Sequence, residues 1–192
     1  MKKNYGKYFS YLQKRSRLGF LYRNYLLYPK ICNHIDGKVL DVGCGIGDFL
    51  NYRPNTTGVD VNPHTVKYCQ KQGFNATVMD IDELPFDSLS FDGILMDNVL
   101  EHIEDPKNIL QEIRRVLLDG GTFVVGVPGS KGYESDPDHK IFYSEEKLIE
   151  VMYLNGFAKQ DSFIMPLNLT WLDNKINQYC IYMTFKKIGK FV

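Results

Sequence analysis

The stretch Val39-Leu40-Asp41-Val42-Gly43-Cys44-Gly45-Ile46-Gly47-Asp48-Phe49-Leu50 decides the fold of this chain. Its first residues are mostly apolar, which predicts a buried strand, and three glycines at alternate positions follow. Glycines in this pattern predict a tight turn where the backbone can approach a ligand, because no Cβ stands in the way. The apolar pair after Asp48 predicts a helix that begins at the turn and offers unpaired N–H groups to a ligand.

From Lys38 onward the chain repeats the order strand, loop, helix. Asn62-Pro63 and Asp105-Pro106 each give a helix N-cap followed by a proline at the first helical position, and Ser144 caps another helix. Such alternating units predict an α/β fold, a parallel sheet with helices on both faces. The expected strands are 38–42, 57–61, 76–79, 91–96, 122–127, 159–165 and 180–186; the expected helices are 48–51, 63–72, 105–118 and 144–155, with Gly120-Gly121 ending the third.

Acidic side chains end three of the expected strands. Asp60, Asp80 and Asp97 close the second, third and fourth strands in turn. Ligands of open α/β sheets bind outside the carboxyl ends of the strands, which is where these acids and the glycine turn fall. The sequence therefore predicts a binding site at this edge.

The composition is that of an ordinary globular protein, with 44% apolar and 24% charged residues in a chain of 192. We expect one domain over residues 1–192. No apolar run approaches the roughly 18 residues of a membrane span, and the N-terminus lacks the apolar core of a signal peptide. The four cysteines form no CxxC pair and no zinc spacing. These features predict a reduced, cytoplasmic protein.

Residues 1–35 contain eight Lys and Arg side chains and no acid, although the whole chain has 23 of each charge. Tyr5 to Cys32 predicts one or two tyrosine-rich helices, divided at Gly19 and ending near Pro29. This basic segment could face an anionic substrate, a nucleic acid or a membrane surface, or it could be a solvated helix whose aromatic side chains pack on the core. We expect a helical cap at 1–35, with the loop 128–143 and the insertion 166–179 on the acceptor side.

Short motifs accompany the glycine turn in a fixed order, and together they resemble class I S-adenosylmethionine (SAM) methyltransferases of the type 11-like group with small-molecule or saccharide acceptors. They are Gly58-Val59-Asp60, Met79-Asp80-Ile81, Phe91-Asp92-Gly93-Ile94, Leu100-Glu101-His102-Ile103 and Leu118-Asp119-Gly120-Gly121. The turn itself is G-x-G-x-G, whereas a dinucleotide-binding turn places its third glycine one residue later. The resemblance covers about Lys38 to Phe157. It implies a Rossmann-like, doubly wound, mostly parallel seven-stranded sheet in the order 3-2-1-4-5-7-6, with strand 7 antiparallel.

The resemblance also implies which residues bind SAM. Gly43, Cys44, Gly45 and Gly47, preceded by Asp41, would place backbone against the methionine and ribose parts. Asp60, followed by Val61, would accept hydrogen bonds from both ribose hydroxyls, a task that suits a carboxylate. Asp80 would accept from the adenine amino group while Ile81 packs on the ring, and Asp97 and Asn98 would contact the methionine end.

Methyl transfer to a hydroxyl needs alignment and a base, and histidine is the natural base near neutral pH. His139 lies in the loop after the fifth strand and His102 directly follows the fourth, so both are candidate catalytic residues. We expect O-methylation of a small molecule or sugar. The alternatives are an N-methyltransferase, which depends less on a base, and a non-catalytic SAM-binding regulatory module. A nucleic-acid acceptor is not expected, because no Asn-Pro-Pro-Tyr type motif follows the fourth strand; peripheral membrane contact through the basic N-terminus stays open.

A divalent metal is the remaining question. Some relatives, including ubiquinone-pathway O-methyltransferases and small-RNA 2′-O-methyltransferases, carry Glu-x-x-Glu-His here and bind a metal with a downstream histidine. In this chain Asn98 replaces the first glutamate, so no metal is expected. Glu101, His102 and His139 stay open as a mixed oxygen and nitrogen ligand set, which Mn²⁺ or Zn²⁺ would suit better than Mg²⁺.

Overall fold

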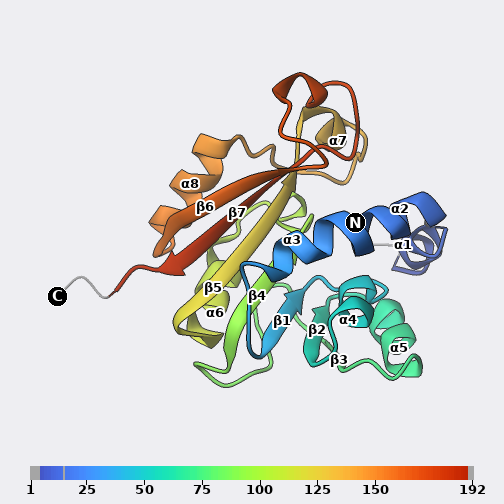
Figure 1. The fold of residues 1–192 in the computed structure, drawn as a ribbon. Coiled ribbons are helices and arrows are strands. Elements are labelled where there is room, and N and C mark those ends of the chain that lie inside the picture. The colour runs from blue at the N-terminus through green and yellow to red at the C-terminus, as the bar shows by residue number, and fades with distance from the viewer. Residues whose placement is uncertain (1–4, 15, 190–192) are drawn as a thin grey trace.

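The computed structural model describes residues 5–14 and 16–189 (Figure 1). The basic residues Lys2, Lys3 and Arg15 and the last three residues of the expected domain lie outside this part. Among the described residues, no helix combines the length and the apolar composition that crossing a membrane requires.

The core is a seven-stranded sheet in the order β3-β2-β1-β4-β5-β7-β6. Strands β1 to β5 pair in parallel, and β7 runs antiparallel to both β5 and β6, which confirms the predicted fold and strand order. The strands are β1 (Val39–Val42), β2 (Thr56–Asp60), β3 (Ala76–Val78), β4 (Phe91–Asp97), β5 (Leu117–Pro128), β6 (Phe157–Met165) and β7 (Cys180–Lys187).

Helices flank the sheet, and the predicted caps begin two of them. Asn62 Oδ1 accepts from the His64 N–H at 2.9 Å, and Ser144 Oγ accepts from the Lys147 N–H at 3.2 Å. The helices are α1 (Tyr5–Leu12), α2 (Arg17–Tyr22), α3 (Tyr28–Cys32), α4 (Asp48–Tyr52), α5 (Pro63–Lys71), α6 (Lys107–Val116), α7 (Ser130–Glu134) and α8 (Glu145–Leu154), with a π-helical segment η1 (Arg23–Leu27) and single 3-10 turns η2 (Leu100–His102) and η3 (Thr170–Leu172).

The central strands are buried on both faces, as parallel strands between helices should be. Successive side chains of β4 enter different cores: Ile94 and Met96 pack with residues of α6 and α8, whereas Leu95 packs with residues of α3 and α4. Figure 1 shows α3 and α4 in front of the sheet and α6 and α8 behind it. The sheet is therefore the middle of three layers, and its carboxyl edge carries the expected site.

The predicted boundaries of the N-terminal helices were wrong. Ser16 Oγ accepts from the Gly19 N–H at 3.1 Å and caps α2, so Gly19 lies in the first turn of that helix. Pro29 lies in the first turn of α3, where its missing N–H leaves no helical bond unmade. The chain is therefore helical from Arg17 to Cys32.

Two further expectations about loops and helix ends were wrong. Helix α6 ends at Val116 and β5 follows at once, so Gly120-Gly121 lies inside a strand and stops no helix. The loop after β5 contains the short helix α7, where the Ser130 N–H and hydroxyl donate to Asp173 at 2.7 and 2.6 Å. This contact is tertiary, which is why local sequence patterns did not predict the helix.

Candidate functional site

The glycine turn joins β1 to α4 in a left-handed backbone conformation that residues with a side chain rarely adopt. Gly43, Gly45 and Gly47 have φ values of 80°, 54° and 81°, a region that glycine enters without steric cost. A Cβ on Gly47 would lie 2.9 Å from the Phe74 ring, and one on Gly43 would collide with Val99. The turn therefore presents bare backbone to the carboxyl edge of the sheet.

Asp60 fixes the turn to the end of β2. Its Oδ2 accepts from the Gly45 N–H at 2.9 Å and its Oδ1 from the Asn62 N–H at 2.8 Å. The carboxylate is buried, and the two backbone donors set its orientation. Because a carboxylate can accept about four hydrogen bonds, Asp60 can hold the turn and also bind vicinal hydroxyls.

A cleft of about 610 Å³ opens at the ends of β2 and β3, next to Asp60 in sequence. Val61, Asp80 and Ile81, all predicted cofactor residues, line it together with Tyr5, Pro63, Val78 and Met79. The walls of this cleft are mostly apolar and include the Asp80 carboxylate, so they could pack on a flat ring and accept a hydrogen bond from its amino group. A second hollow of about 630 Å³ lies around the Glu112–Arg115 ion pair and contains none of the predicted site residues.

Asp97 and Asn98 end β4 on the other side of the turn. Asp97 Oδ1 accepts from the Tyr182 hydroxyl and from the Asn98 amide, both at 2.8 Å. Asn98 has a φ of 53° and donates its backbone N–H to the Gly126 carbonyl at 2.9 Å. The end of β4 is thus held by β5 and β7.

Several carboxyl groups lie under the turn. Asp41 is buried within β1, and burial together with the neighbouring charges of Asp97 and Asp60 holds its pKa well above the ordinary value. Cys44 is buried too, and its hydrogen bond with the Cys69 thiol, together with burial, raises its pKa. Mutually repelling carboxylates of this kind favour a ligand that brings positive charge.

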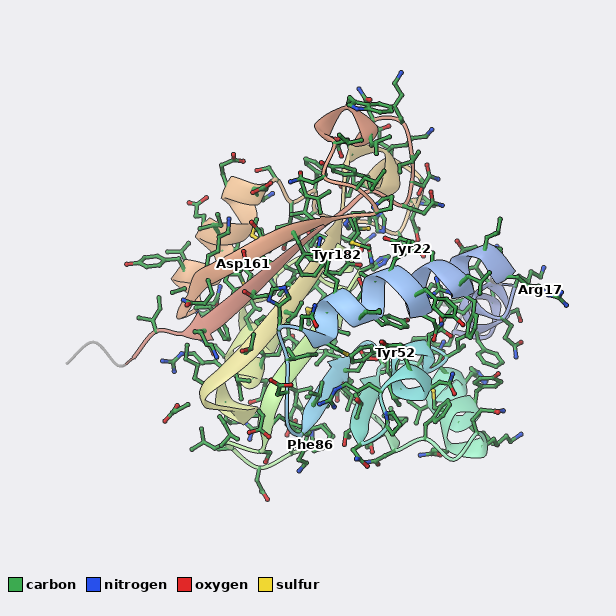
Figure 2. The ribbon with its side chains drawn as sticks, in the orientation of Figure 1. Arg17, Tyr22, Tyr52, Phe86, Asp161 and Tyr182 are labelled. Atoms are coloured by element: carbon green, nitrogen blue, oxygen red, sulfur yellow. The ribbon has the colours of Figure 1, made fainter. Side chains whose placement is uncertain are left out.

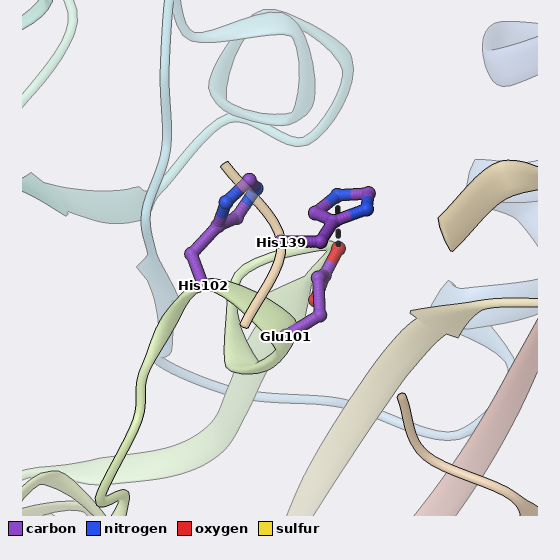
Figure 3. A group of neighbouring side chains, drawn as sticks. All are labelled: Glu101, His102 and His139. Carbon is purple, nitrogen blue, oxygen red and sulfur yellow. Dashed lines mark ion pairs between the residues drawn. The ribbon is translucent and has the colours of Figure 1, made fainter. Parts of the chain in front are cut away.

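A second group of side chains lies past the end of β4 (Figure 3). Glu101 and His102 come from η2, and His139 comes from the loop after α7; one potential ligand atom of each lies within 4.8 Å of the others. His139 Nε2 is 3.8 Å from Glu101 Oε1, and the two imidazole centroids are 4.6 Å apart. The structure therefore brings both predicted histidines together around one carboxyl group.

Backbone contacts hold these histidines in place. His139 Nδ1 lies 2.7 Å from the Tyr133 carbonyl, which can only accept, so Nδ1 carries a proton and Nε2 turns toward Glu101. The Lys140 and Ile141 N–H groups donate to the Glu101 carbonyl at 2.7 and 3.2 Å, which ties the His139 loop to η2.

Glu101 is the unusual member of this group. It is 1% exposed, and neither of its carboxyl oxygens has a hydrogen-bond partner among residues 5–14 and 16–189. Burial raises the pKa of Glu101 to about 8. Buried polar atoms normally have partners, so these oxygens mark a place where a proton, a ligand or a metal could act.

Sequence reasoning missed the residues that support the site. Tyr182 in β7 bonds Asp97, and Tyr133 in α7 orients His139. Tyr143 directly precedes Ser144, the N-cap of α8; it is buried, and its hydroxyl also lacks a hydrogen-bond partner in the described part. Tyr133 and Tyr182 belong to no motif, whereas Tyr143 lies in the stretch 138–144 around His139, which resembles a family segment, although no role was predicted for it. For Tyr182 the one local signal was Gly126, its neighbour in the β5–β7 pairing, because glycine leaves room for that ring.

Comparisons with known proteins show similarity to methyltransferases. Residues 40–125 match a family model described as a methyltransferase domain. An uncharacterised protein of Methanocaldococcus jannaschii is 31% identical over 66% of this chain and 64% of its own length. A "Probable S-adenosylmethionine-dependent methyltransferase" of Mycolicibacterium smegmatis is 27% identical over 73% of this chain and 60% of its own. The chain thus spans less than two thirds of these relatives.

Among solved structures, the fold is similar to the "putative methyltransferase" in complex with the Haloferax volcanii Trm112 methyltransferase activator. The TM-score is 0.74 at 16% identity, over 98% of this chain and 100% of that one. A likeness at this identity concerns the fold, and it agrees with the strand order described above.

Proposed function

We propose that the chain is a class I SAM-dependent methyltransferase that transfers the methyl group of SAM to a hydroxyl of a small-molecule or saccharide acceptor. The methyltransferase family model over residues 40–125 and the similarity to a probable SAM-dependent methyltransferase support this proposal. The observation that carries the proposal is the convergence of the glycine turn, the Asp60 carboxylate and the cleft lined by Asp80 at one edge of the sheet. Ribose, adenine and the methionine end of SAM need these three surfaces in adjacent places.

In the proposed complex, the backbone at Gly43, Gly45 and Gly47 lies against the methionine and ribose parts. Asp60 accepts from the ribose hydroxyls while it keeps its bonds to the Gly45 and Asn62 N–H groups. Asp80 accepts from the adenine amino group, and Val61 and Ile81 pack on the ring.

The acids beneath the turn serve the charged end of SAM. Asp41, Asp97 and Asn98 surround the place of the sulfonium and the amino group. A cation there lowers the mutual repulsion of the carboxylates, since opposite charges favour the ionised form.

On the acceptor side, His139 is the proposed base. With its proton on Nδ1 held by Tyr133, the Nε2 lone pair takes the hydroxyl proton while the oxygen attacks the methyl carbon. The carbon–sulfur bond breaks, its electron pair stays on sulfur, and S-adenosylhomocysteine leaves neutral at sulfur. We propose that His102, 4.6 Å away between ring centroids, positions this base or the acceptor.

Two measurements test this function. Calorimetry should detect S-adenosylhomocysteine binding, and a panel of hydroxyl and amine acceptors should reveal turnover through methylated product. The variant His139→Ala should lose far more activity on a hydroxyl than on an amine, because a neutral amine needs no proton removed before attack. Binding without turnover on any acceptor would instead support the non-catalytic SAM-binding module, and turnover restricted to amines would support an N-methyltransferase.

A metal-assisted transfer is the second candidate, favoured by the unpartnered Glu101 oxygens beside two imidazoles. Glu101, His102 and His139 would hold the ion, and Mn²⁺ or Zn²⁺ fits their oxygen and nitrogen donors. A bound ion would act as a Lewis acid that acidifies the acceptor hydroxyl. Titration calorimetry of the purified chain with each metal decides the matter without an activity assay: binding that Glu101→Gln abolishes supports the site, and absence of binding rejects it.

A further inference from the structure

The helical segment from Arg17 to Cys32 has a large apolar face turned to solvent. Leu18, Leu21, Tyr25 and Leu26 are 78%, 47%, 73% and 56% exposed. The first three recur at spacings of three and four residues, which places them on one side of the segment. Soluble helices normally carry polar residues on such a side. We call these four residues the outer face.

The opposite side of the same segment packs against the sheet. Leu27, Tyr28 and Ile31 are buried in a core that includes Tyr182 of β7. Figure 2 shows Tyr22 and Tyr182 on the sheet side of this segment and Arg17 at its far end. The segment is therefore apolar on two sides, and packing against the sheet accounts for only one of them.

Positive charge lies at the N-terminal end of the outer face. No acidic residue occurs in residues 1–35, and the exposed side chains of Lys14 and Arg17 directly precede Leu18. Arg23 is engaged elsewhere, in an ion pair with Asp48 at 3.1 Å. The surface thus combines exposed leucines, a tyrosine and cations, the composition of helices that lie in a membrane interface.

We propose that the outer face docks on an anionic lipid bilayer. Leucines would enter the boundary between headgroups and acyl chains, Tyr25 would lie at the headgroup level, and Lys14 and Arg17 would meet lipid phosphates. A second copy of the chain fits less well, because residues 1–35 contain no acidic residue that could pair with Lys14 and Arg17 across a contact between two such segments. A nucleic acid would meet the cations but leave the leucines in water.

Docking at this face would also orient the chain. The Arg23–Asp48 ion pair connects the segment to α4, directly after the glycine turn. A bilayer held by the outer face would therefore lie on the far side of this segment from the proposed SAM site. This inference concerns the surface alone and does not depend on methyl transfer.

Vesicle co-sedimentation of the full chain tests the proposal. Vesicles of phosphatidylcholine with a third phosphatidylglycerol are compared with pure phosphatidylcholine, at low and high salt. We expect binding to the anionic vesicles that salt weakens, and a loss of about tenfold in the double variant Leu18→Ser, Leu21→Ser. The matched control is Tyr153→Ser, Leu154→Ser on α8, whose side chains are 57% and 74% exposed and which should bind like the wild type.

Folding of each variant is verified by its urea unfolding transition. The proposal is overturned if the wild type binds no anionic vesicles, or if the Leu18, Leu21 variant binds as well as the control. It is also overturned if light scattering shows a dimer that the Leu18, Leu21 variant dissociates while vesicles do not bind, because a second copy would then occupy the face.

Discussion

Replacement of Asp60 by asparagine separates the two tasks that the proposed function gives this side chain. The carboxylate accepts from the Gly45 and Asn62 N–H groups at 2.9 and 2.8 Å, one on each oxygen. Asparagine keeps the size but offers one acceptor oxygen, so one of these bonds is lost and an amide N–H faces a backbone donor. Hydrogen bonds to charged groups contribute about 1.5–3 kcal/mol each. We therefore expect the free energy of unfolding to fall by about that amount.

The same change should weaken ligand binding by a comparable free energy, because one ribose hydroxyl loses its charged acceptor. That corresponds to a dissociation constant for S-adenosylhomocysteine about 10 to 100 times higher. Calorimetry measures the affinity, and urea unfolding measures the stability. The matched control is Asp161→Asn, an exposed acid on β6 that should alter neither.

A ligand analogue sharpens the test. A 2′-deoxy analogue of S-adenosylhomocysteine should bind the wild type more weakly than the parent compound, whereas Asp60→Asn should discriminate less between the two. Wild-type affinity in a folded Asp60→Asn variant would refute the proposed ribose contact. An equal loss for both ligands would show that Asp60 acts only by holding the glycine turn.

Three other substitutions have defined outcomes. Gly47→Ala should lower the free energy of unfolding by about 1–2 kcal/mol more than Gly73→Ala. Both glycines have a φ near 80°, but only a Cβ at position 47 would meet a neighbour, Phe74. Urea unfolding of the two variants measures the difference. Burial holds the pKa of Asp41 above its ordinary value, so the folded chain keeps a proton that the unfolded chain loses above about pH 4. The free energy of unfolding should therefore fall as pH rises, and Asp41→Asn, which has no such proton, should show a smaller fall between pH 5 and pH 8. Tyr143→Phe removes a buried hydroxyl that has no partner in the described part, so urea unfolding should show unchanged or higher stability, by up to about 1–3 kcal/mol; a large loss would mean that the hydroxyl is paired.

The fold was predictable because its signals are local and agree with each other. Strand β1, the glycine turn and the caps at Asn62 and Ser144 are each specified within a few residues, and the order of the strands followed from the family resemblance. The missed helix α7 is a case where a distant contact decides. Asp173 builds α7 from across the chain, and no pattern around Ser130 reveals that partner.

The candidate site also has a part that the sequence predicts well and a part that it predicts poorly. The residues proposed to bind SAM are backbone or strand-end positions, so the sequence could place them from the rhythm of strands and turns. The acceptor side depends instead on loops that meet in space: His139 reaches Glu101 because the Lys140 and Ile141 N–H groups bind the Glu101 carbonyl. A loop-to-loop contact of this kind has no periodicity, so only the family resemblance suggested Glu101, His102 and His139 as one group, and the structure shows that they lie together.

Buried polar atoms without a hydrogen-bond partner draw attention to the surroundings of Glu101. In the part of the chain that the structure describes, the buried side-chain atoms without a hydrogen-bond partner belong to Arg23, Glu101 and Tyr143. Each such atom costs about 1–3 kcal/mol when it stays unpaired. Local rules are otherwise obeyed in the sheet and at the caps, and departures from them tend to occur at functional sites. Burial, and after it the nearby carboxylate of Glu101, raises the pKa of Tyr143 to about 12, so these two groups share one environment. A ligand that supplies these missing partners would recover this free energy on binding, and this is why the proposed function places the acceptor beside Glu101, His102 and His139.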